Sequence, residues 1–203
     1  NNLKTHTYSD YGEYTITCDG TSIPGGTTSK GGMFDQYSNV NRYWCKALRI
    51  GNNVTDIGAS ALQNCAAMLY VTIPESVSDI GNYALTGCLS LETITIPKAV
   101  DVILDYVFQA GGIRKIMMPQ SITRIGGSAF TSNSQLEAIT VPLNVTSIGG
   151  SAFYGCMNLR NTTIVIPRGV TTISATTFQN CHRVREYDFT DAISIPTLAL
   201  RLH

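Results

Sequence analysis

Proline recurs along this chain at nearly constant intervals, and that periodicity constrains the fold more than any other feature of the sequence. The intervals are 23, 22, 23 and 25 residues, between Pro74, Pro97, Pro119, Pro142 and Pro167. An isoleucine column keeps nearly the same interval, and glycine follows the isoleucine in four of its six positions: Ile57, Ile80, Ile103, Ile125, Ile148 and Ile173. A third column holds leucine or phenylalanine, at Leu62, Leu85, Phe108, Phe130, Phe153 and Phe178. Three columns in register at a period near 23 residues predict a solenoid with one coil per unit.

Each unit is predicted to contain one short strand and one compact return. In the segment 91–97 apolar and polar residues alternate, so Ile94 and Ile96 face the core while Thr93 and Thr95 face solvent. Proline ends the strand because it lacks the amide donor that a central ladder requires. The I-G-x-x-A-F segment that follows has an apolar spacing near three, which predicts a short helical turn. Stacking of equivalent residues at ~4.8 Å then makes one long core.

The complete repeat resembles that of a known family. The segment Val145-Thr146-Ser147-Ile148-Gly149-Gly150-Ser151-Ala152-Phe153-Tyr154-Gly155-Cys156-Met157-Asn158-Leu159 is similar to the BspA-like, Treponema-type leucine-rich repeat, and residues from about Cys45 to Pro196 can be aligned with its pattern. The resemblance implies a right-handed α/β leucine-rich-repeat solenoid, with parallel strands on the concave side and short helical or 3-10 turns on the convex side. It also implies secreted or surface-attached proteins, many of them bacterial, that bind host matrix proteins or other cells and have no enzymatic activity.

We expect two parts in the chain. Residues 1–44 do not fit the repeat and are predicted to form an N-terminal cap, which would cover the open strand edges of the first coil. Residues 45–203 are predicted to form an array of six to seven units of about 23 residues, the last one incomplete. After Pro196 either the last residues form a small cap or the natural protein continues. The chain starts at Asn1, so a secretion signal that has been removed is a natural candidate for what preceded it.

The charge and hydropathy of the chain exclude several classes of partner. With 14 basic and 14 acidic side chains the formal charge is zero, which gives no indication of a nucleic-acid partner. No apolar run approaches the ~18 residues of a membrane helix, so we expect no membrane span. The resemblance implies that the protein is located outside the cell or at the cell surface.

The six cysteines allow two interpretations. Four share one column, three residues after the leucine or phenylalanine position: Cys65, Cys88, Cys156 and Cys181. Gly111 and Asn133 occupy the same column in other coils, Cys45 lies in a second core column, and Cys18 lies in the predicted cap. We predict buried free thiols, since cysteine is among the most buried residue types. The alternative is disulfides between stacked neighbours, Cys65–Cys88 and Cys156–Cys181.

No catalytic residue, metal or cofactor is predicted. The chain has three histidines, His6, His182 and His203, and no C-x-x-C or H-x-x-x-H pair that would suit zinc. Without a base, no serine or cysteine would be activated as a nucleophile. A glycan-cleaving solenoid enzyme would need facing carboxylates. The outward strand positions offer only Glu186 and Asp188, both on one strand.

The predicted binding surface is the outward face of the strands, where threonine dominates. Tyr70, Lys115 and Met117 interrupt the threonines with side chains that tend to anchor interfaces. The competing interpretation is that threonine is there for its strand propensity alone. The candidate face consists of Arg49, Tyr70, Thr72, Thr93, Thr95, Lys115, Met117, Thr140, Thr163, Val165, Glu186 and Asp188. We expect a non-enzymatic module for adhesion to a protein or glycan at a host or bacterial surface. The alternatives are an architectural spacer within a larger surface protein and a glycan-cleaving enzyme.

Overall fold

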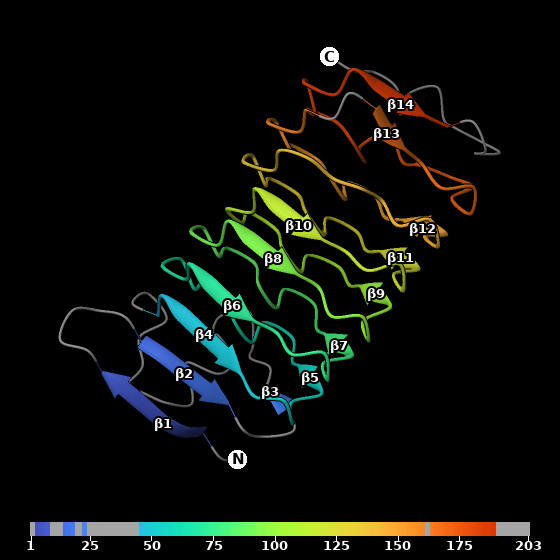
Figure 1. The fold of residues 1–203 in the computed structure, drawn as a ribbon. Coiled ribbons are helices and arrows are strands. Elements are labelled where there is room, and N and C mark those ends of the chain that lie inside the picture. Colours follow the sequence, from blue (N-terminus) through green and yellow to red (C-terminus); the bar gives the residue numbers. More distant parts are fainter. Residues whose placement is uncertain (1–2, 9–13, 19–21, 24–44, 161–162, 190–203) are drawn as a thin grey trace.

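The chain winds into a stack of coils, and most of the coils contribute a short strand to one face of the stack (Figure 1). The computed structural model describes residues 3–8, 14–18, 22–23, 45–160 and 163–189. The main row of strands is β2 (Tyr14–Cys18), β4 (Ala47–Ile50), β6 (Tyr70–Thr72), β8 (Thr93–Thr95), β10 (Lys115–Met117), β13 (Thr163–Val165) and β14 (Glu186–Asp188). A second row consists of two-residue strands: β3 (Ser22–Ile23), β5 (Asp56–Ile57), β7 (Asp79–Ile80), β9 (Val102–Ile103), β11 (Arg124–Ile125) and β12 (Ser147–Ile148).

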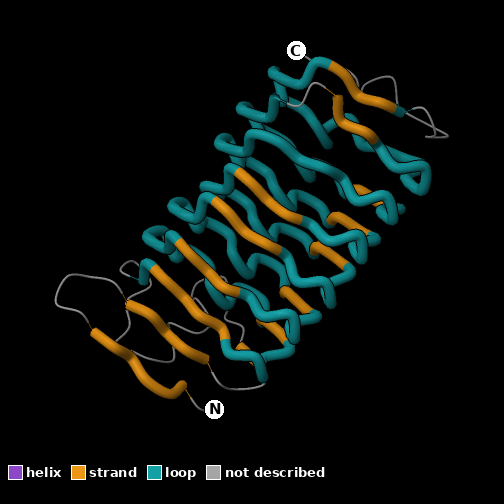
Figure 2. The backbone as a smooth tube through the Cα atoms, viewed as in Figure 1, coloured by secondary structure: helices purple, strands orange, loops and turns teal. Residues whose placement is uncertain are grey.

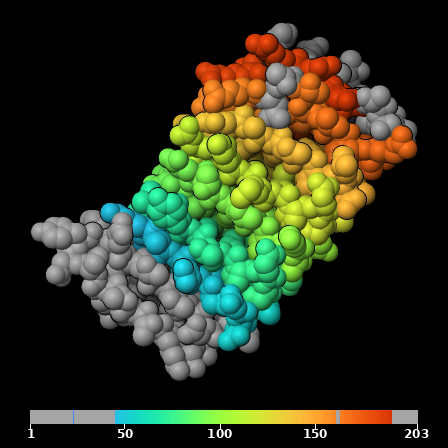
Figure 3. Space-filling model, viewed as in Figure 1, coloured from blue at the N-terminus to red at the C-terminus, as the bar shows by residue number. Residues whose placement is uncertain are grey.

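We number the coils by their main strands. Coils 1 to 4 begin with β4, β6, β8 and β10, coil 5 has residues 138–140 in the strand position, and coils 6 and 7 begin with β13 and β14. Figure 3 shows them as adjacent bands from cyan to red. Paired strands of successive coils are parallel and in register, so that Ile94 lies beside Ile116 and Ile164 beside Tyr187. The predicted solenoid of parallel strands is confirmed.

Strand pairing extends to residues that the sequence pattern does not cover. β2 pairs in parallel with β4, β3 pairs with β5, and β1 (Leu3–Tyr8) pairs antiparallel with the other edge of β2. Residues 24–44 and 190–203 lie outside the described part of the chain, as do the side chains of Cys18 and His6. The domain division at residue 44 and the cap at the end of the chain therefore stay predictions.

The return segments are tandem turns, and the described residues form no helix (Figure 2). The amide of Cys65 donates to the carbonyl of Leu62 at 3.3 Å and closes one turn, whereas the amide of the intervening Asn64 donates to Thr86 of the next coil at 2.7 Å. Asn64 has a positive φ of 60°, which suits the third position of a type II turn. In a helix every backbone amide would donate to a carbonyl of its own coil, whereas here alternate amides donate to a carbonyl of the next coil. The apolar spacing near three thus comes from turns rather than from the predicted helical or 3-10 segments.

Stacked phenylalanines fill the centre of the core. Phe108, Phe130, Phe153 and Phe178 are buried, and the ring centroids of neighbours are 5.2 Å apart. Tyr187 continues the column at 4.9 Å from Phe178 with a tilted ring. Its position in β14 corresponds to an isoleucine in other coils, so the aromatic residue there lets coil 7 extend the stack.

The cysteine column donates hydrogen bonds to the preceding coil. The thiols of Cys88, Cys156 and Cys181 lie 3.3, 3.3 and 3.1 Å from the carbonyls of Leu62, Phe130 and Phe153, respectively. The described cysteines, at positions 45, 65, 88, 156 and 181, are all buried free thiols, as predicted.

Asn133 takes the place of cysteine in coil 4 and makes the same kind of bond. Its amide nitrogen lies 2.6 Å from the carbonyl of Phe108. Asparagine is larger than cysteine, and a Cβ atom on Gly111 in coil 3 would lie 2.9 Å from its Oδ1 atom. The two departures from the repeat are therefore one feature, because Gly111 makes the space that Asn133 fills.

Candidate binding face

The outward side chains of the main strands form the strand face, which is the surface predicted to bind. Tyr70 and Met117 are 66% and 63% exposed, and Lys115 and Arg49 are also exposed. The structure gathers part of the predicted set around a pocket of about 300 Å³, the β6/β8 pocket. Tyr70, Val71, Thr72, Ile73, Thr93, Ile94, Thr95 and Met117 line it.

The β6/β8 pocket lies where the parallel ladder is interrupted. Hydrogen-bonded pairing runs from β1 through β2 and β4 to β6, and begins again with β8 and β10. The second row of strands stops at the same junction, because β3, β5 and β7 form one sheet and β9, β11 and β12 another. Val71 and Ile73 are only partly buried beside this junction, whereas Ile94 and Ile96 retain 3% and 2% exposure. The opening thus exposes apolar side chains to a ligand.

A second pocket lies at the junction of coils 5 and 6. It has a volume of about 360 Å³ and is lined by Gln120, Ile139, Thr140, Val141, Leu143, Thr163 and Val165. We call it the β13 pocket, because β13 pairs with β14 but with no described strand of coil 5. Leu143 and Val165 are 71% and 50% exposed at its rim.

A single position in the repeat accounts for both interruptions. Glycine follows the column isoleucine in coils 1, 2, 4 and 5, and it packs against the backbone of the coil before it. A Cβ atom would lie 2.4 Å from a backbone atom of that coil at Gly81, 2.6 Å at Gly126 and 2.4 Å at Gly149. Coil 3 has Leu104 at this position and coil 6 has Ser174. Since a side chain cannot fit at that spacing, the strand rows separate at these two junctions.

The two pockets were not predicted from the sequence. The signal was present in the two column isoleucines that glycine does not follow, Ile103 and Ile173. Val71, Ile73 and Leu143 line these pockets and are not among the residues predicted to bind.

The predicted face is not one continuous site. Its C-terminal members engage one another, since the Oγ1 atom of Thr163 donates to a carboxylate oxygen of Glu186 at 3.0 Å. Thr163 and Asp188 are only partly exposed. From coil 1 to coil 5 the outward positions hold the cations Arg49 and Lys115 and no acidic residue: Ala47, Arg49, Tyr70, Thr72, Thr93, Thr95, Lys115, Met117, Ala138 and Thr140. These outward positions thus carry two positive charges and no negative one.

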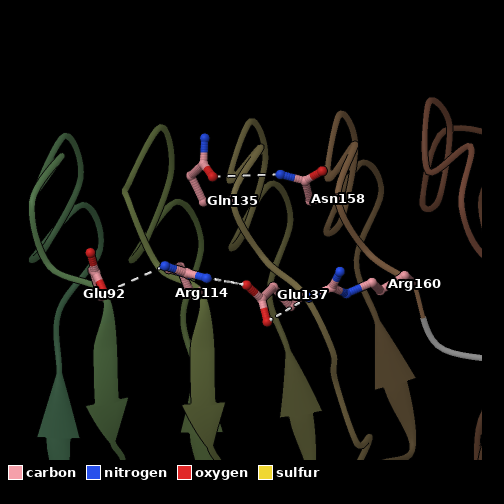
Figure 4. A network of polar contacts seen from close by, with 6 residues as sticks. All are labelled: Glu92, Arg114, Gln135, Glu137, Asn158 and Arg160. Atoms are coloured by element: carbon pink, nitrogen blue, oxygen red, sulfur yellow. Dashed lines mark hydrogen bonds and ion pairs between the residues drawn. The ribbon is translucent and has the colours of Figure 1, made fainter.

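A ladder of charged side chains runs along the edge where the strands begin (Figure 4). Arg114 lies 3.9 Å from Glu92 and 2.5 Å from Glu137, and Arg160 lies 3.0 Å from the other oxygen of Glu137. The hydrogen bonds from Arg114 and then from Arg160 lower the pKa of Glu137, and the bond to Glu137 raises the pKa of Arg114. These acids and arginines neutralise one another. Lys115, next in sequence to Arg114, forms no ion pair with a described residue, so its charge is available on the strand face.

Within the described residues, no group of three or more His, Cys, Asp and Glu side chains is arranged to hold a metal ion. The described part of the chain contains no helix that could cross a membrane.

Comparisons with known proteins match the repeat. Residues 35–160 and 157–198 match the family described as BspA type leucine rich repeat region, in six copies. A leucine-rich-repeat protein of Treponema pallidum has 21% sequence identity and a TM-score of 0.67, covering 94% of this chain and 79% of its own. One from Bacteroides ovatus has 22% identity and a TM-score of 0.72, covering 100% of this chain and 56% of its own. A leucine-rich cell surface protein of Faecalibacterium prausnitzii has 21% identity and a TM-score of 0.51, covering 93% of this chain and 73% of its own. No curated protein has a matching sequence.

Proposed function

Because the chain belongs to the BspA-type leucine-rich-repeat family, we propose that it is a non-enzymatic binding module displayed outside the cell. Its ligand is a protein or glycan of a host or bacterial surface, and the strand face holds it. The observation that carries this proposal is the β6/β8 pocket, where exposed Tyr70 and Met117 surround apolar floor residues beside the cation Lys115. Aromatic, apolar and charged groups around a concavity are typical of binding sites.

The location outside the cell rests on the family and on one structural relative. The Faecalibacterium prausnitzii protein is described as a cell surface protein.

An architectural spacer is the first alternative. A spacer needs only a continuous stack and places no requirement on its outward side chains. Two pockets on one face, each next to exposed apolar side chains, favour recognition over spacing.

A glycan-cleaving enzyme is the second alternative. Such an enzyme places two carboxylates across a scissile bond. On the described outward strand positions the carboxylates are Glu186 and Asp188 of β14, and Glu186 is hydrogen-bonded to Thr163. No third carboxylate faces them from another described strand, so the arrangement favours binding.

A triple variant tests the proposal. Tyr70→Ala, Lys115→Ala and Met117→Ala together remove exposed side chains only, so we expect the fold to persist and binding to be lost. Binding would be measured by surface plasmon resonance against host matrix proteins, mucins and a glycan array. Matched control changes are Ser128→Ala and Ser132→Ala on the turn side, whose hydroxyls make no hydrogen bond within the described residues. The proposal fails if the triple variant binds like the parent while the turn-side changes abolish binding.

A further inference from the structure

The two pockets of the strand face are separated by a fixed number of coils. Residues of coils 2 and 3 make up most of the β6/β8 pocket and residues of coils 5 and 6 most of the β13 pocket. Coil 4 lies between them and adds Met117 to the first pocket and Gln120 to the second. We propose that the strand face binds an extended acidic peptide that crosses the strands, with one apolar side chain in each pocket and a carboxylate between them. This inference rests on the proposed function and specifies its partner.

The spacing of the pockets fits an extended chain. Three coil steps at the ~4.8 Å distance between paired strands amount to about 14 Å. An extended peptide advances roughly 3.4 Å per residue, so four residues cover about the same distance. Side chains at i and i+4 of such a peptide point to the same side. Both can therefore enter the pockets together, and residue i+2 lies over β10.

The lining of the pockets selects apolar side chains. Tyr70 and Met117 border the first pocket beside Val71 and Ile94, and aliphatic side chains make up most of the second, with Gln120, Thr140 and Thr163 as its polar members. A glycan ring could stack on Tyr70, but four of the seven side chains that line the second pocket are aliphatic, and hydroxyls placed against them would lose hydrogen bonds to water. An aromatic or aliphatic side chain loses nothing there and gains by burial.

The charge between the pockets selects an acidic residue. Lys115 is exposed on β10, has no ion-pair partner among the described residues and is accompanied by no acid at the outward positions of coils 1 to 5. The nearby acids Glu92 and Glu137 are engaged by Arg114 and Arg160. A carboxylate at i+2 would meet Lys115 without competition, and a cation there would be repelled.

Fluorescein-labelled synthetic peptides test the inference by anisotropy titration with the full chain. The reference peptide has Phe at i and i+4 and Glu at i+2 in a background of Ser and Gly. One variant moves the second Phe to i+3, and another replaces the Glu with Lys. We expect the reference to bind about tenfold tighter than the shifted peptide, the effect of withdrawing one aromatic side chain from a pocket. Lys115→Glu should weaken the binding of the reference peptide and strengthen the binding of the Lys peptide. Because Lys115 is exposed, this reversal reports on the charge contact and not on a change in the fold.

The outcomes separate this inference from the proposed function. Equal binding of the reference and shifted peptides overturns the inference, as does the absence of any reversal with Lys115→Glu. If the peptides do not bind, but hyaluronan or a matrix protein binds in a way that the triple variant abolishes, the inference fails and the proposed function stands. If no ligand binding depends on the triple variant, both fail.

Discussion

The turn side and the strand side of the stack follow different rules, although one repeat builds both. On the turn side an amide from the leucine or phenylalanine column donates to the next coil at every described junction from coil 1 to coil 6. The distances are 2.8, 2.9, 2.9, 2.8 and 2.9 Å, from Leu62, Leu85, Phe108, Phe130 and Phe153. On the strand side both rows of strands are interrupted at two of those same junctions, and the main row is reduced to the single bridge of Lys115 with Ala138 at the junction of coils 4 and 5. Coils can therefore remain stacked while their strands separate.

The difference shows how a regular repeat can acquire local sites. The core and the turn ladder keep the coils in register, so the strand side can lose pairing without loss of the stack. Pairing is lost where a side chain replaces glycine, at Leu104 and Ser174. One residue per coil thus decides whether a junction is closed or forms a pocket.

The strongest test of this comparison removes the continuous core. Phe130→Ala and Phe153→Ala should each lower the free energy of unfolding by about 3–5 kcal/mol, because each fully buried ring leaves a cavity in the aromatic column. Urea denaturation monitored by circular dichroism would measure the loss. Thr95→Ala on the strand face serves as the control and should change stability by less than about 0.5 kcal/mol. Losses under ~1 kcal/mol at both phenylalanines would show that the core does not hold the coils together.

Much of this organisation could be predicted from the sequence, because it follows from periodicity. The core columns, the outward threonines and the buried cysteines depend only on which residues recur. The turns could not be predicted in the same way, since a spacing near three does not reveal that the Asn64 amide bonds to another coil. Nor could the pockets, because they depend on departures from the repeat. Leu104 and Ser174 indicate an open junction only when it is known that Gly81, Gly126 and Gly149 pack closely against the backbone of the preceding coil.

A substitution at the glycine position should open a closed junction. Gly126→Leu places a side chain where even a Cβ atom would lie 2.6 Å from the backbone of Leu104. We expect a loss of about 1–3 kcal/mol, typical of overpacking, with separation of β9 from β11. Hydrogen–deuterium exchange would show faster exchange in β9 and β11 and unchanged protection in the turns.

The matched control for that variant is Gly150→Ala, where the nearest atoms that a Cβ would meet are side-chain atoms of Ser174 at 3.7 Å or more. It should leave both rows of strands protected. If Gly126→Leu exposes the turn amides as much as the strands, the two sides are not independent and the comparison does not hold.

The smallest effect is expected in the reactivity of the cysteine thiols at neutral pH. Their labelling in the native protein shows how far the two pockets reach toward the core. Cys88 and Cys156 belong to coils 2 and 5, directly before the two open junctions, yet they retain 1% and 0% exposure. Burial raises the pKa of Cys88 to about 12 from an ordinary 9.0, and a hydrogen bond with Cys181, followed by burial, raises that of Cys156. Few thiolates therefore form near neutral pH, and iodoacetamide should modify neither residue in native buffer but both in denaturant, as mapped by mass spectrometry.

Because the folded pKa of Cys88 lies above the unfolded one, its contribution to stability is complete below pH 9.0 and declines by about 1.4 kcal/mol per pH unit as the pH rises toward 12. Rapid native labelling of Cys88, with protection of Cys45 just before coil 1 as the internal control, would mean that the β6/β8 opening passes through the core rather than ending at the strand face.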